Sequence, residues 1–503
     1  MVFWRIFAGS KMESASVNIQ RLSEFVVEHY GDDPSRLVLQ KDKWPGIDVG
    51  AAASTLLCRR KLSSKAPLWA TEPGLVMPLT LSAEQCSSAV TARHKADFIA
   101  EIFKRNRLSG SRSEAAEGPR VADLTGGLGV DSLEFSRIAE KVFYNEMNPL
   151  LSEAARYNFG VLGAWNIDIH SFETSMESLK VEGGNLGSLL EKFHPDVIFL
   201  DPARRDGCGN KVFLLEDCSP DILEIEERLL EIAPSVVLKL SPMADVSMVV
   251  KRLGERRCRE VQIIEAGGEC KELLVRLGRE DVKASGKRPC VVKAFNLDCG
   301  DKPLLEYEFA LKAAEGVGNG SCCRLAGENE IESGAVLFEP GKALMKAGCF
   351  DLIGEKLGAA MLGHDTHYYI MDNGSLSLNA DNVSDSLNAG NGSDSLNMSG
   401  EAISLTDGGK LFRILEVAPL SGKTIKEFGK THPEAEVSAR GVRISSEELR
   451  KRIGCRASER FHIFALHADS QNGNLLLFTE RIFPESSEAK TVTDDAVKAD
   501  EQK

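Results

Sequence analysis

One stretch of the chain, residues 119–148, constrains the fold more than any other. A short apolar run leads into a loop with almost no side-chain bulk. The loop residues are Thr125, Gly126, Gly127 and Gly129. Apolar residues then recur at helical spacing over 130–140, and a second apolar run over 142–144 leads to Glu146. This succession of strand, glycine loop, helix and strand predicts the start of a nucleotide-binding βαβ unit.

Two details of this loop distinguish between the nucleotide ligands that such a unit binds. A dinucleotide fingerprint requires G-x-G-x-x-G, but the sequence from Gly127 reads G-L-G-V-D-S, with Ser132 at the third glycine position. Asp123 precedes the loop, where it would repel a phosphate and attract an ammonium group. The loop therefore favours S-adenosylmethionine over NAD. We expect Glu146, at the end of the next strand, to accept hydrogen bonds from both ribose hydroxyls.

The region 116–285 alternates apolar strands with amphipathic helices. Strands are expected over 121–124, 142–144, 166–169, 196–200, 236–240 and 261–265, and helices over 130–140, 149–159, 172–179, 221–232, 244–253 and 271–277. This alternation predicts an α/β fold with a doubly wound, mostly parallel, Rossmann-like sheet. Ligands bind at the carboxyl ends of such strands, so we expect four acids to share one crevice. They are Asp123, Glu146, Asp168 and Asp201.

Composition places the chain among ordinary soluble proteins. Its 43% hydrophobic and 27% charged residues allow a sizeable core. No run reaches the roughly 18 apolar residues of a membrane helix, and the apolar start of the chain is too short for a secretory signal, so we expect a cytoplasmic protein. Twelve cysteines without a C-x-x-C pair predict reduced thiols and no metal site. The net charge of −14 excludes a whole-surface nucleic-acid binder, so any such site must be a local patch.

The segments on either side of this region differ from it in composition. Helical periodicity with Pro and Gly punctuation predicts an N-terminal helical domain over 14–115. Residues 286–372 have the pattern of a separate α+β unit, and residues 410–484 regain strand and helix patterns. The Asn-, Gly- and Ser-rich insertion 373–409 and the acidic tail 485–503 are too polar to form a core, and we expect both to be disordered.

A basic cluster lies near the C-terminal end. Residues 410–482 contain 13 Lys and Arg against 9 acids, an excess of four positive charges. Arg450, Lys451 and Arg452 are candidates for contact with phosphates. A solvated helix face over 447–452 explains the same residues equally well, so the sequence leaves both interpretations open.

A second motif, D-P-A-R-R, follows the apolar strand over 196–200. Methyl transfer is an in-line displacement on a sulfonium carbon, so a protein mainly has to align the nucleophile and manage its proton. Asp201 is placed to do this, although a plain strand-ending D-P turn is the structural alternative. Arg204 and Arg205 are candidates either for binding a phosphate or for orienting a base.

With both motifs placed, the chain resembles the bacterial class I S-adenosylmethionine-dependent methyltransferases that carry a C-terminal THUMP-like domain. The resemblance covers most of the chain. The matching segments are E-Q-C-S-S-A-V-T-A-R-H-K-A (84–96), D-L-T-G-G-L-G-V-D (123–131), F-L-D-P-A-R-R-D (199–206), L-K-L-S-P-M-A-D (238–245), G-G-E-C-K-E-L (267–273) and F-E-P-G-K-A-L-M-K-A-G (338–348).

The resemblance implies a ferredoxin-like unit over 286–372 and a THUMP-like module over 410–484. Because THUMP domains bind tRNA, it also implies an RNA substrate, either tRNA or rRNA. Our hypothesis is that the methionine end of the cofactor is held by Asp123, Thr125, Gly126, Gly127 and Gly129. Glu146 would then contact the ribose and Asp168 the adenine. Asp201 would contact the cofactor and orient or deprotonate the acceptor.

The motif after the fourth strand narrows the reaction. Methyltransferases of exocyclic amines usually carry [DN]-P-P-[YFW], whereas Ala203 and Arg204 stand here in place of the second proline and the aromatic residue. The form D-P-A-R is more similar to the D-P-P-R of the RNA uracil C5 methyltransferases. Those enzymes need a nucleophilic cysteine where Leu240 stands, so C5 chemistry is disfavoured unless Cys208 or Cys218 substitutes. A ring nitrogen or a ribose remains open as the target.

Three alternatives stay open at this point. The chain could methylate a small molecule and use its C-terminal module only structurally, or it could bind the cofactor as a scaffold without catalysis. An NAD-dependent oxidoreductase is the third, which Ser132 and Asp123 disfavour. Residues 84–95, with Ser, Ser and Thr before an apolar helix, are interpreted as a capped helix entry rather than as a substrate contact.

Overall fold

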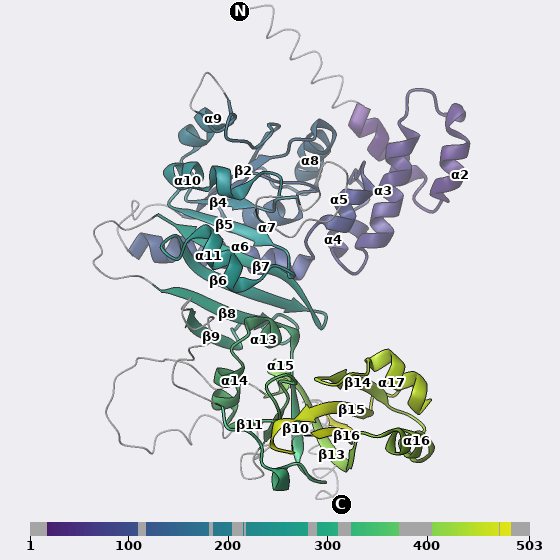
Figure 1. Cartoon of the computed structure of the whole chain (residues 1–503). Coiled ribbons are helices and arrows are strands. Elements are labelled where there is room, and N and C mark those ends of the chain that lie inside the picture. The colour runs from purple at the N-terminus through teal and green to yellow at the C-terminus, as the bar shows by residue number, and fades with distance from the viewer. Residues whose placement is uncertain are drawn as a thin grey trace, which may run out of the picture. The chain divides into compact units, whose positions relative to one another are not determined.

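The computed structural model describes residues 18–108, 117–180, 185–203, 215, 218–279, 289–309, 323–371, 405–471 and 473–483 (Figure 1). The predictions for Arg204, Arg205, Cys208 and most of the segments 373–409 and 485–503 therefore lie outside the described residues. The chain divides into two compact units. The first contains Met1–Ala266, Lys271–Val292 and Glu308–Leu311, and the second contains Gly267–Cys270, Lys293–Tyr307 and Lys312–Lys503.

The N-terminal part of the first unit is helical, as predicted. A helix over 18–28 is followed by α2 (Pro34–Leu39), α3 (Val49–Leu62), α4 (Pro67–Thr71), α5 (Thr80–Gln85) and the long α6 (Ala89–Leu108). Asp33 and Asp48 cap α2 and α3 by accepting backbone N–H bonds at the helix starts. Apolar residues of the first helix pack with α2 and α3 in a core of their own, and α6 packs against α7 of the sheet region.

A nine-stranded sheet forms the centre of the α/β region, in the order β3-β2-β1-β4-β5-β7-β6-β8-β9 (Figure 1). The strands are β1 (Arg120–Asp123), β2 (Lys141–Asn145), β3 (Ile167–His170), β4 (Val197–Leu200), β5 (Ser235–Leu240), β6 (Cys258–Ala266), β7 (Glu269–Gly278), β8 (Cys290–Asn296) and β9 (Leu305–Phe309). The first five pair in parallel, and β7 is antiparallel to β5. The Rossmann-like prediction is confirmed, and the order reverses between β1 and β4, where such sheets bind ligands.

The helices that join these strands are α7 (Val130–Ile138), α8 (Pro149–Val161), α9 (Leu186–Phe193), α10 (Ile222–Ile232) and α11 (Val246–Leu253). Two predictions about this region are wrong. Residues 172–179 form turns rather than a helix, and α9 lies further along the chain. Residues 271–277 are part of strand β7, because Gly267 and Gly268 have φ of 61° and 68° and turn β6 back on itself as a hairpin.

The second unit contains a seven-stranded sheet in the order β11-β12-β10-β13-β16-β15-β14. Its strands are β10 (Val336–Pro340), β11 (Ala359–Met361), β12 (Tyr369–Met371), β13 (Gly409–Pro419), β14 (Glu436–Arg440), β15 (Phe461–Ala468) and β16 (Gly473–Ile482). Its helices are α13 (Lys342–Ala347), α14 (Phe350–Leu357), α15 (Leu405–Gly408), α16 (Gly422–Thr431) and α17 (Ser446–Ile453).

The expected boundary between the last two domains does not coincide with a break in structure. Strand β10, from the expected ferredoxin-like part, pairs with β13, from the expected THUMP-like part. Both parts therefore share one sheet. In addition, β8 and β9 extend the nine-stranded sheet, although the sequence placed them in the separate α+β unit. No described helix is both long enough and apolar enough to span a bilayer.

Candidate functional site

The glycine loop lies between β1 and α7, at the carboxyl end of the central strand. Gly127 and Gly129 have φ of 55° and 95°, a region that side chains with a Cβ disfavour. Gly126 is required for another reason, because a Cβ there would lie 2.1 Å from Cε2 of Tyr144. The hydroxyl of Tyr144 donates to the carbonyl of Gly127 over 2.6 Å. The ring of Tyr144 thus sets the path of the loop.

Asp123 is turned inward at the base of this loop. It is 1% exposed, and its carboxylate accepts the backbone N–H of Thr125 at 3.1 Å and the hydroxyl of Ser132 at 2.5 Å. Burial is the main cause that raises the pKa of Asp123 to about 7, while the Ser132 hydrogen bond opposes it. Ser132, which broke the dinucleotide fingerprint, is therefore the partner of Asp123. Asp123 holds the loop rather than offering an exposed carboxylate.

Glu146 lies on the other side of the loop, just after β2. One of its oxygens accepts the N–H of Gly127 and the other accepts the N–H of Asn148, both at 2.8 Å. Asn148 in turn caps helix α8. The carboxylate is thus fixed beside the glycine loop, at the place where the sequence predicts a contact with ribose hydroxyls.

Asp201 follows the fully buried strand β4 and lies beside the same loop. Its backbone N–H donates to Oγ1 of Thr125 at 2.6 Å, and its Oδ2 accepts from Nζ of Lys239 at 2.5 Å. Its side chain is 28% exposed. The loop residues thus connect Glu146 and Asp201 by a hydrogen bond on each side, whereas the sequence predicted only that the two acids share a crevice.

Asp168 does not join this group. It lies inside β3, which ends at His170, and its carboxylate pairs with Nζ of Lys141 at 2.6 Å. Lys141 begins β2, so this ion pair lies away from the carboxyl end of the sheet. The expectation that Asp168 ends its strand is wrong by two residues. The loop at that position begins with Ser171, whose hydroxyl donates to the carbonyl of Glu146.

Behind Asp201 lies a chain of buried charges that the sequence did not reveal. Lys239 on β5 contacts Asp201 and, at 4.0 Å, Glu272 on β7. Glu272 accepts from Lys95 on α6 at 2.6 Å, and Lys95 reaches Asp131 on α7 at 3.3 Å. Lys95 is 0% exposed, so both of its ionic contacts are shielded from water. These residues come from five of the six segments that carried the family resemblance.

The segment 84–96 takes a defined place in this arrangement. Ser88 bonds to the N–H of Thr91 at the start of α6, which fits the predicted capped helix entry. Ser87, however, donates to Oδ2 of Asp131 at 2.7 Å. The start of α6 is therefore hydrogen-bonded to the helix that follows the glycine loop. Near it, Cys86 is a partly buried free thiol whose pKa burial raises.

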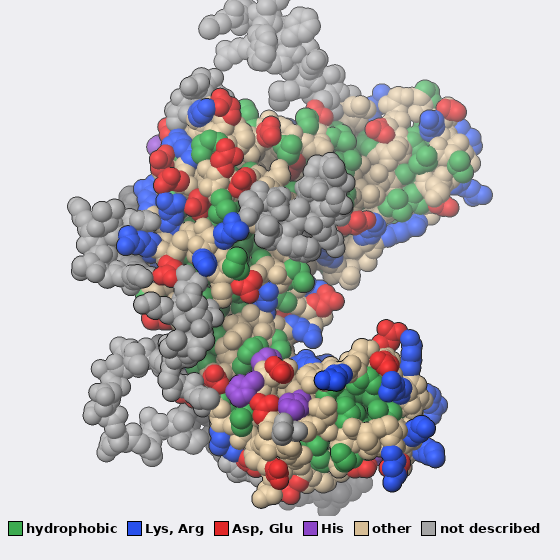
Figure 2. Space-filling model, in the orientation of Figure 1, with side chains coloured by type: hydrophobic (Ala, Val, Ile, Leu, Met, Phe, Trp, Pro, Cys, Tyr) green, Lys and Arg blue, Asp and Glu red, His purple; other side chains and the backbone are tan. Residues whose placement is uncertain are grey.

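In the second unit, the predicted phosphate-contact residues on α17 are each paired with an acid. Arg450 contacts Glu436 on β14, while Lys451 and Arg452 contact Glu447 and Glu448 one helical turn earlier. All three cations are exposed. Figure 2 shows Lys and Arg side chains gathered along the edge of this module, where Figure 1 places α16 and α17. This geometry corresponds to the solvated helix face that the sequence left open.

A cavity of about 490 Å³ lies on the sheet of this module, lined among others by Lys410, Phe412, Glu459, His462 and Arg481. Phe412 and Arg481 are direct partners across β13 and β16, and so share a face of the sheet. Among the described residues, neither Lys410 nor Arg481 has an acidic partner. Burial, with nearby Lys410 second, lowers the pKa of His462 to about 3. The imidazole is therefore neutral and stacks on Phe464 at 4.0 Å.

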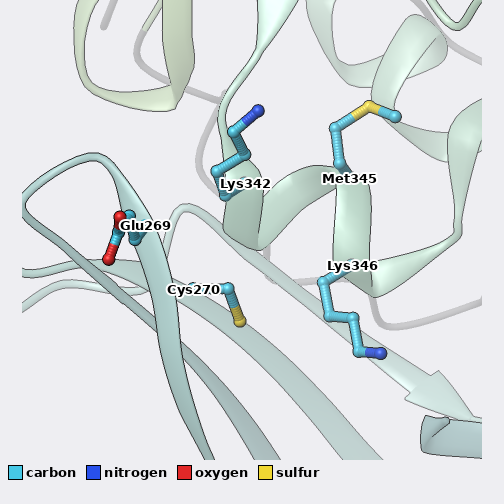
Figure 3. A pocket seen from close by; sticks show the side chains of 5 residues that line it. All are labelled: Glu269, Cys270, Lys342, Met345 and Lys346. Atoms are coloured by element: carbon cyan, nitrogen blue, oxygen red, sulfur yellow. The ribbon is translucent and has the colours of Figure 1, made fainter. Parts of the chain in front are cut away.

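A further cavity, of about 430 Å³, is lined by Glu269, Cys270, Lys342, Met345 and Lys346. Figure 3 shows that the charged ends of these side chains point in different directions, with the ammonium group of Lys342 turned away from Cys270. The side chains do not converge on one point. Within the described residues, no group of three potential metal ligands occurs.

Two family models match parts of the chain. A ferredoxin-like domain matches residues 337–375, and a THUMP domain-like model matches residues 409–481. These matches place the ferredoxin-like part in the segment from β10 onward and assign β13 to β16 to the THUMP-like module. Comparison with curated proteins finds no match.

Among solved structures, the chain is similar to a putative methyltransferase from Porphyromonas gingivalis W83. The identity is 25%, the similarity covers 92% of this chain and 98% of that chain, and the TM-score is 0.69. A putative class I S-adenosylmethionine-dependent methyltransferase from Listeria monocytogenes has 8% identity over 56% of this chain and 93% of its own, with a TM-score of 0.30. An rRNA methylase from Streptococcus thermophilus has 14% identity over 37% and 93%, with a TM-score of 0.23. The last two scores are too low to bear on what this chain does.

Proposed function

We propose that this chain, which shares the fold of a putative methyltransferase along 92% of its length, is an S-adenosylmethionine-dependent methyltransferase that modifies tRNA or rRNA. The observation that carries the proposal is the link between the glycine loop and two acids. Gly127 donates to Glu146, and Thr125 accepts from the backbone of Asp201. The acid proposed to bind the cofactor and the acid proposed to bind the acceptor are thus held by two residues of one loop, Gly127 and Thr125.

The residues around the loop fit the proposed cofactor. Glycines at 126, 127 and 129 leave the loop without side chains, which permits close approach of a ligand to its backbone. Each oxygen of Glu146 accepts one backbone hydrogen bond, so lone pairs remain for hydroxyl donors. When bound, S-adenosylmethionine would supply the electrophilic methyl group. Asp168 has no part in this proposal, because its carboxylate pairs with Lys141.

Asp201 is the residue that we propose for acceptor binding. Its second oxygen, Oδ1, is free of the contact with Lys239 and can accept a hydrogen bond from the group to be methylated. Methyl transfer needs the acceptor atom in line with the methyl group, and a fixed carboxylate supplies that alignment. The support for RNA is the THUMP domain-like match over 409–481 together with Lys410 and Arg481, which line the cavity and have no acidic partner among the described residues.

The first test is calorimetric titration of S-adenosylmethionine, S-adenosylhomocysteine and NAD into the full chain. We expect both adenosyl ligands to bind and NAD not to bind. Glu146→Ala should weaken adenosyl binding about 10-fold or more, because a pair of hydrogen bonds to a charged group is lost. The exposed Glu153→Ala on α8 is the matched control and should change nothing. Binding of NAD alone would overturn the proposal.

The second test is transfer of labelled methyl groups to RNA from a strain that lacks the gene. Asp201→Asn keeps the shape of the side chain but removes its charge, and we expect kcat to fall about 100-fold while the affinity for S-adenosylmethionine stays within about twofold. If the wild type binds the cofactor but transfers no methyl group, the interpretation as a non-catalytic scaffold is the one that remains. If it methylates low-molecular-weight extracts but not RNA, the chain is a small-molecule methyltransferase. Because Asp168 pairs with Lys141, we expect Asp168→Asn to leave the affinity for both adenosyl ligands unchanged.

A further inference from the structure

Lys239 is buried at the point where the acceptor would bind, although nothing in the proposed function requires a lysine there. Its side chain is 9% exposed and its ammonium contacts Oδ2 of Asp201 at 2.5 Å. Glu272 lies on its other side at 4.0 Å. Because β5 and β7 are neighbouring strands, Lys239 and Glu272 are held by the sheet itself, with Lys239 in register with Leu274.

Lys239 stays positively charged in this setting. Burial alone would lower its pKa, but the carboxylates of Asp201 and Glu272 outweigh burial and raise the pKa above its ordinary value. The ammonium therefore cannot serve as a base that removes a proton. It can donate hydrogen bonds, and one of them goes to Asp201.

The chain of charges continues to helix α6. Lys95, fully buried, bridges Glu272 and Asp131, and Ser87 binds the other oxygen of Asp131. Lysines and carboxylates thus alternate from the helix after the glycine loop to Asp201. Removing any one member leaves a buried charge without its partner, so the members hold one another in position.

We propose that Lys239 is a positioning residue for the methyl acceptor, that Glu272 and Lys95 hold it in place, and that Asp201 consequently orients a nitrogen acceptor as a charged hydrogen-bond acceptor. This inference rests on the proposed methyltransferase function. It makes α6 part of the reaction site, and it distinguishes between the nitrogen and ribose targets that the sequence left open.

The chemical reason is the difference between nitrogen and oxygen acceptors. A neutral ring or exocyclic nitrogen attacks with its own lone pair, so the new N–C bond forms as the S–C bond of the sulfonium breaks, and the sulfur keeps the electron pair of the broken bond. Any N–H proton leaves afterwards to water. A ribose hydroxyl needs a base during the attack. Because Oδ2 of Asp201 already accepts from the Lys239 ammonium, the carboxylate is held in one orientation and Oδ1 is presented to an N–H of the acceptor.

Other charged groups act on the same centre and enter the interpretation of any pH profile. Asp123 at the end of β1 and Asp131 on α7 lie on the side of the glycine loop. Lys65, which follows α3, lowers the pKa of Cys86. Burial is the main cause that lowers the pKa of Lys65 itself, and Lys239, Lys271 and Asp131 also act on it. Lys239 also acts on the pKa values of Lys65 and Cys86, so the readouts that isolate its pair with Asp201 are kcat, cofactor affinity and the recovery of rate by arginine.

The experiment uses the full chain, labelled S-adenosylmethionine and bulk tRNA from a strain that lacks the gene. Lys239→Met, Lys239→Arg and the double variant Lys95→Met with Glu272→Gln are compared with the control Lys104→Met, at an exposed position of α6. We expect Lys239→Met to lower kcat at least about 30-fold with cofactor affinity within about twofold. Lys239→Arg should restore at least one third of the lost rate.

Nucleoside analysis of the product decides the second part of the inference, and we expect the methyl group on a base nitrogen. A methyl group on a ribose oxygen or a base carbon would overturn it. An unchanged kcat in Lys239→Met, or no recovery of the rate in Lys239→Arg, would overturn the positioning role. If Lys239→Met does not fold, Lys95→Met with Glu272→Gln decides, since it keeps Lys239 but removes its support, and an unchanged kcat in that double variant contradicts the inference. Absence of transfer by the wild type is a different result, which overturns the proposed function before any variant is made.

Discussion

The charged residues of the strand-end crevice and those of the THUMP-like module differ in how they are partnered. In the crevice, Lys95 and Lys239 are buried and each contacts two carboxylates. In the module, Arg450 and Lys451 are exposed on α17 and each pairs with a single acid. A buried pair is costly to break, whereas an exposed pair contributes little. The crevice is therefore a rigid site in which each charge has a defined place.

The same comparison separates two kinds of basic residue within the module. The cations of α17 are neutralised by their neighbours on the helix and on β14, and those around the sheet cavity, Lys410 and Arg481, have no acidic partner among the described residues. Free cations gain more than paired ones when they meet a phosphate, because no existing pair has to be broken. Sequence proximity of basic residues is thus a poorer guide to a phosphate site than their partners are.

The largest effect is expected from Lys95→Met. The substitution leaves Asp131 and Glu272 buried without their shared ammonium, which costs about 3–5 kcal/mol. Urea unfolding followed by tryptophan fluorescence, to which the buried Trp69 contributes with the chain's three other tryptophans, measures the loss. Adding Glu272→Gln should recover part of it. The exposed Lys451→Met should change the free energy of unfolding by less than about 0.5 kcal/mol, and an equal loss in both variants would remove the contrast between the regions.

The pH dependence of stability tests the burial of Asp123. Its pKa is about 7 in the folded chain against an ordinary value of 3.8, so the folded state binds more protons between these values. This group therefore stabilises the fold at acidic pH, and the contribution is lost as the pH rises toward and through 7. The upper limit is about 4 kcal/mol. Asp123→Asn should be less pH-dependent than the wild type between pH 5 and 8. If the stability of Asp123→Asn depended on pH in the same way as that of the wild type, Asp123 would not be the group that causes this dependence.

Gly126→Ala should act on cofactor binding more than on stability. The added Cβ would lie 2.1 Å from the Tyr144 ring, so the loop or the ring must move, at a cost of about 1–3 kcal/mol. We expect the affinity for S-adenosylmethionine to fall about 10-fold or more in titrations. Gly31→Ala, at a position where φ is not positive and a Cβ meets nothing within 4 Å, is the matched control. Equal losses of affinity in both variants would contradict a specific role of Tyr144.

Local patterns predicted some parts of this molecule well and others poorly, for physical reasons. The position of the glycine loop, with Glu146 and Asp201 on either side of it, was predictable because each lies at a strand end that a local pattern marks. Strand β7 was mistaken for a helix because its inner residues are apolar over a continuous run, and only its hairpin pairing with β6 shows the strand. The contacts of Lys95 with Glu272 and of Lys239 with Asp201 join residues far apart in sequence, so no spacing rule reveals them.

The smallest effect, and the sharpest test of the comparison, concerns RNA binding by the THUMP-like module. We expect Lys410→Glu with Arg481→Glu to weaken binding of bulk tRNA about 10-fold in filter-binding assays. The slope of log affinity against log salt should fall by about 1.4, because two phosphate contacts are lost. Reversing Arg450, Lys451 and Arg452 together should cost less than this double variant, although it changes more charge, because those three side chains already have acidic partners.

The matched control is Lys426→Glu with Lys430→Glu on α16. It makes the same change in charge as the Lys410 and Arg481 variant within the same module. Helix α16 packs on the face formed by Ile463 and Phe478, whereas Phe412 and Phe464 lie in the core of the opposite face. Strand residues alternate between the faces, so the control pair and the cavity lie on opposite sides of one sheet. If the control weakened tRNA binding as much as the cavity variant, net charge alone would explain the binding. If only the charge reversal of Arg450, Lys451 and Arg452 weakened tRNA binding, these exposed cations would form the contact surface. The presence or absence of an acidic partner would then not predict which cations bind phosphate.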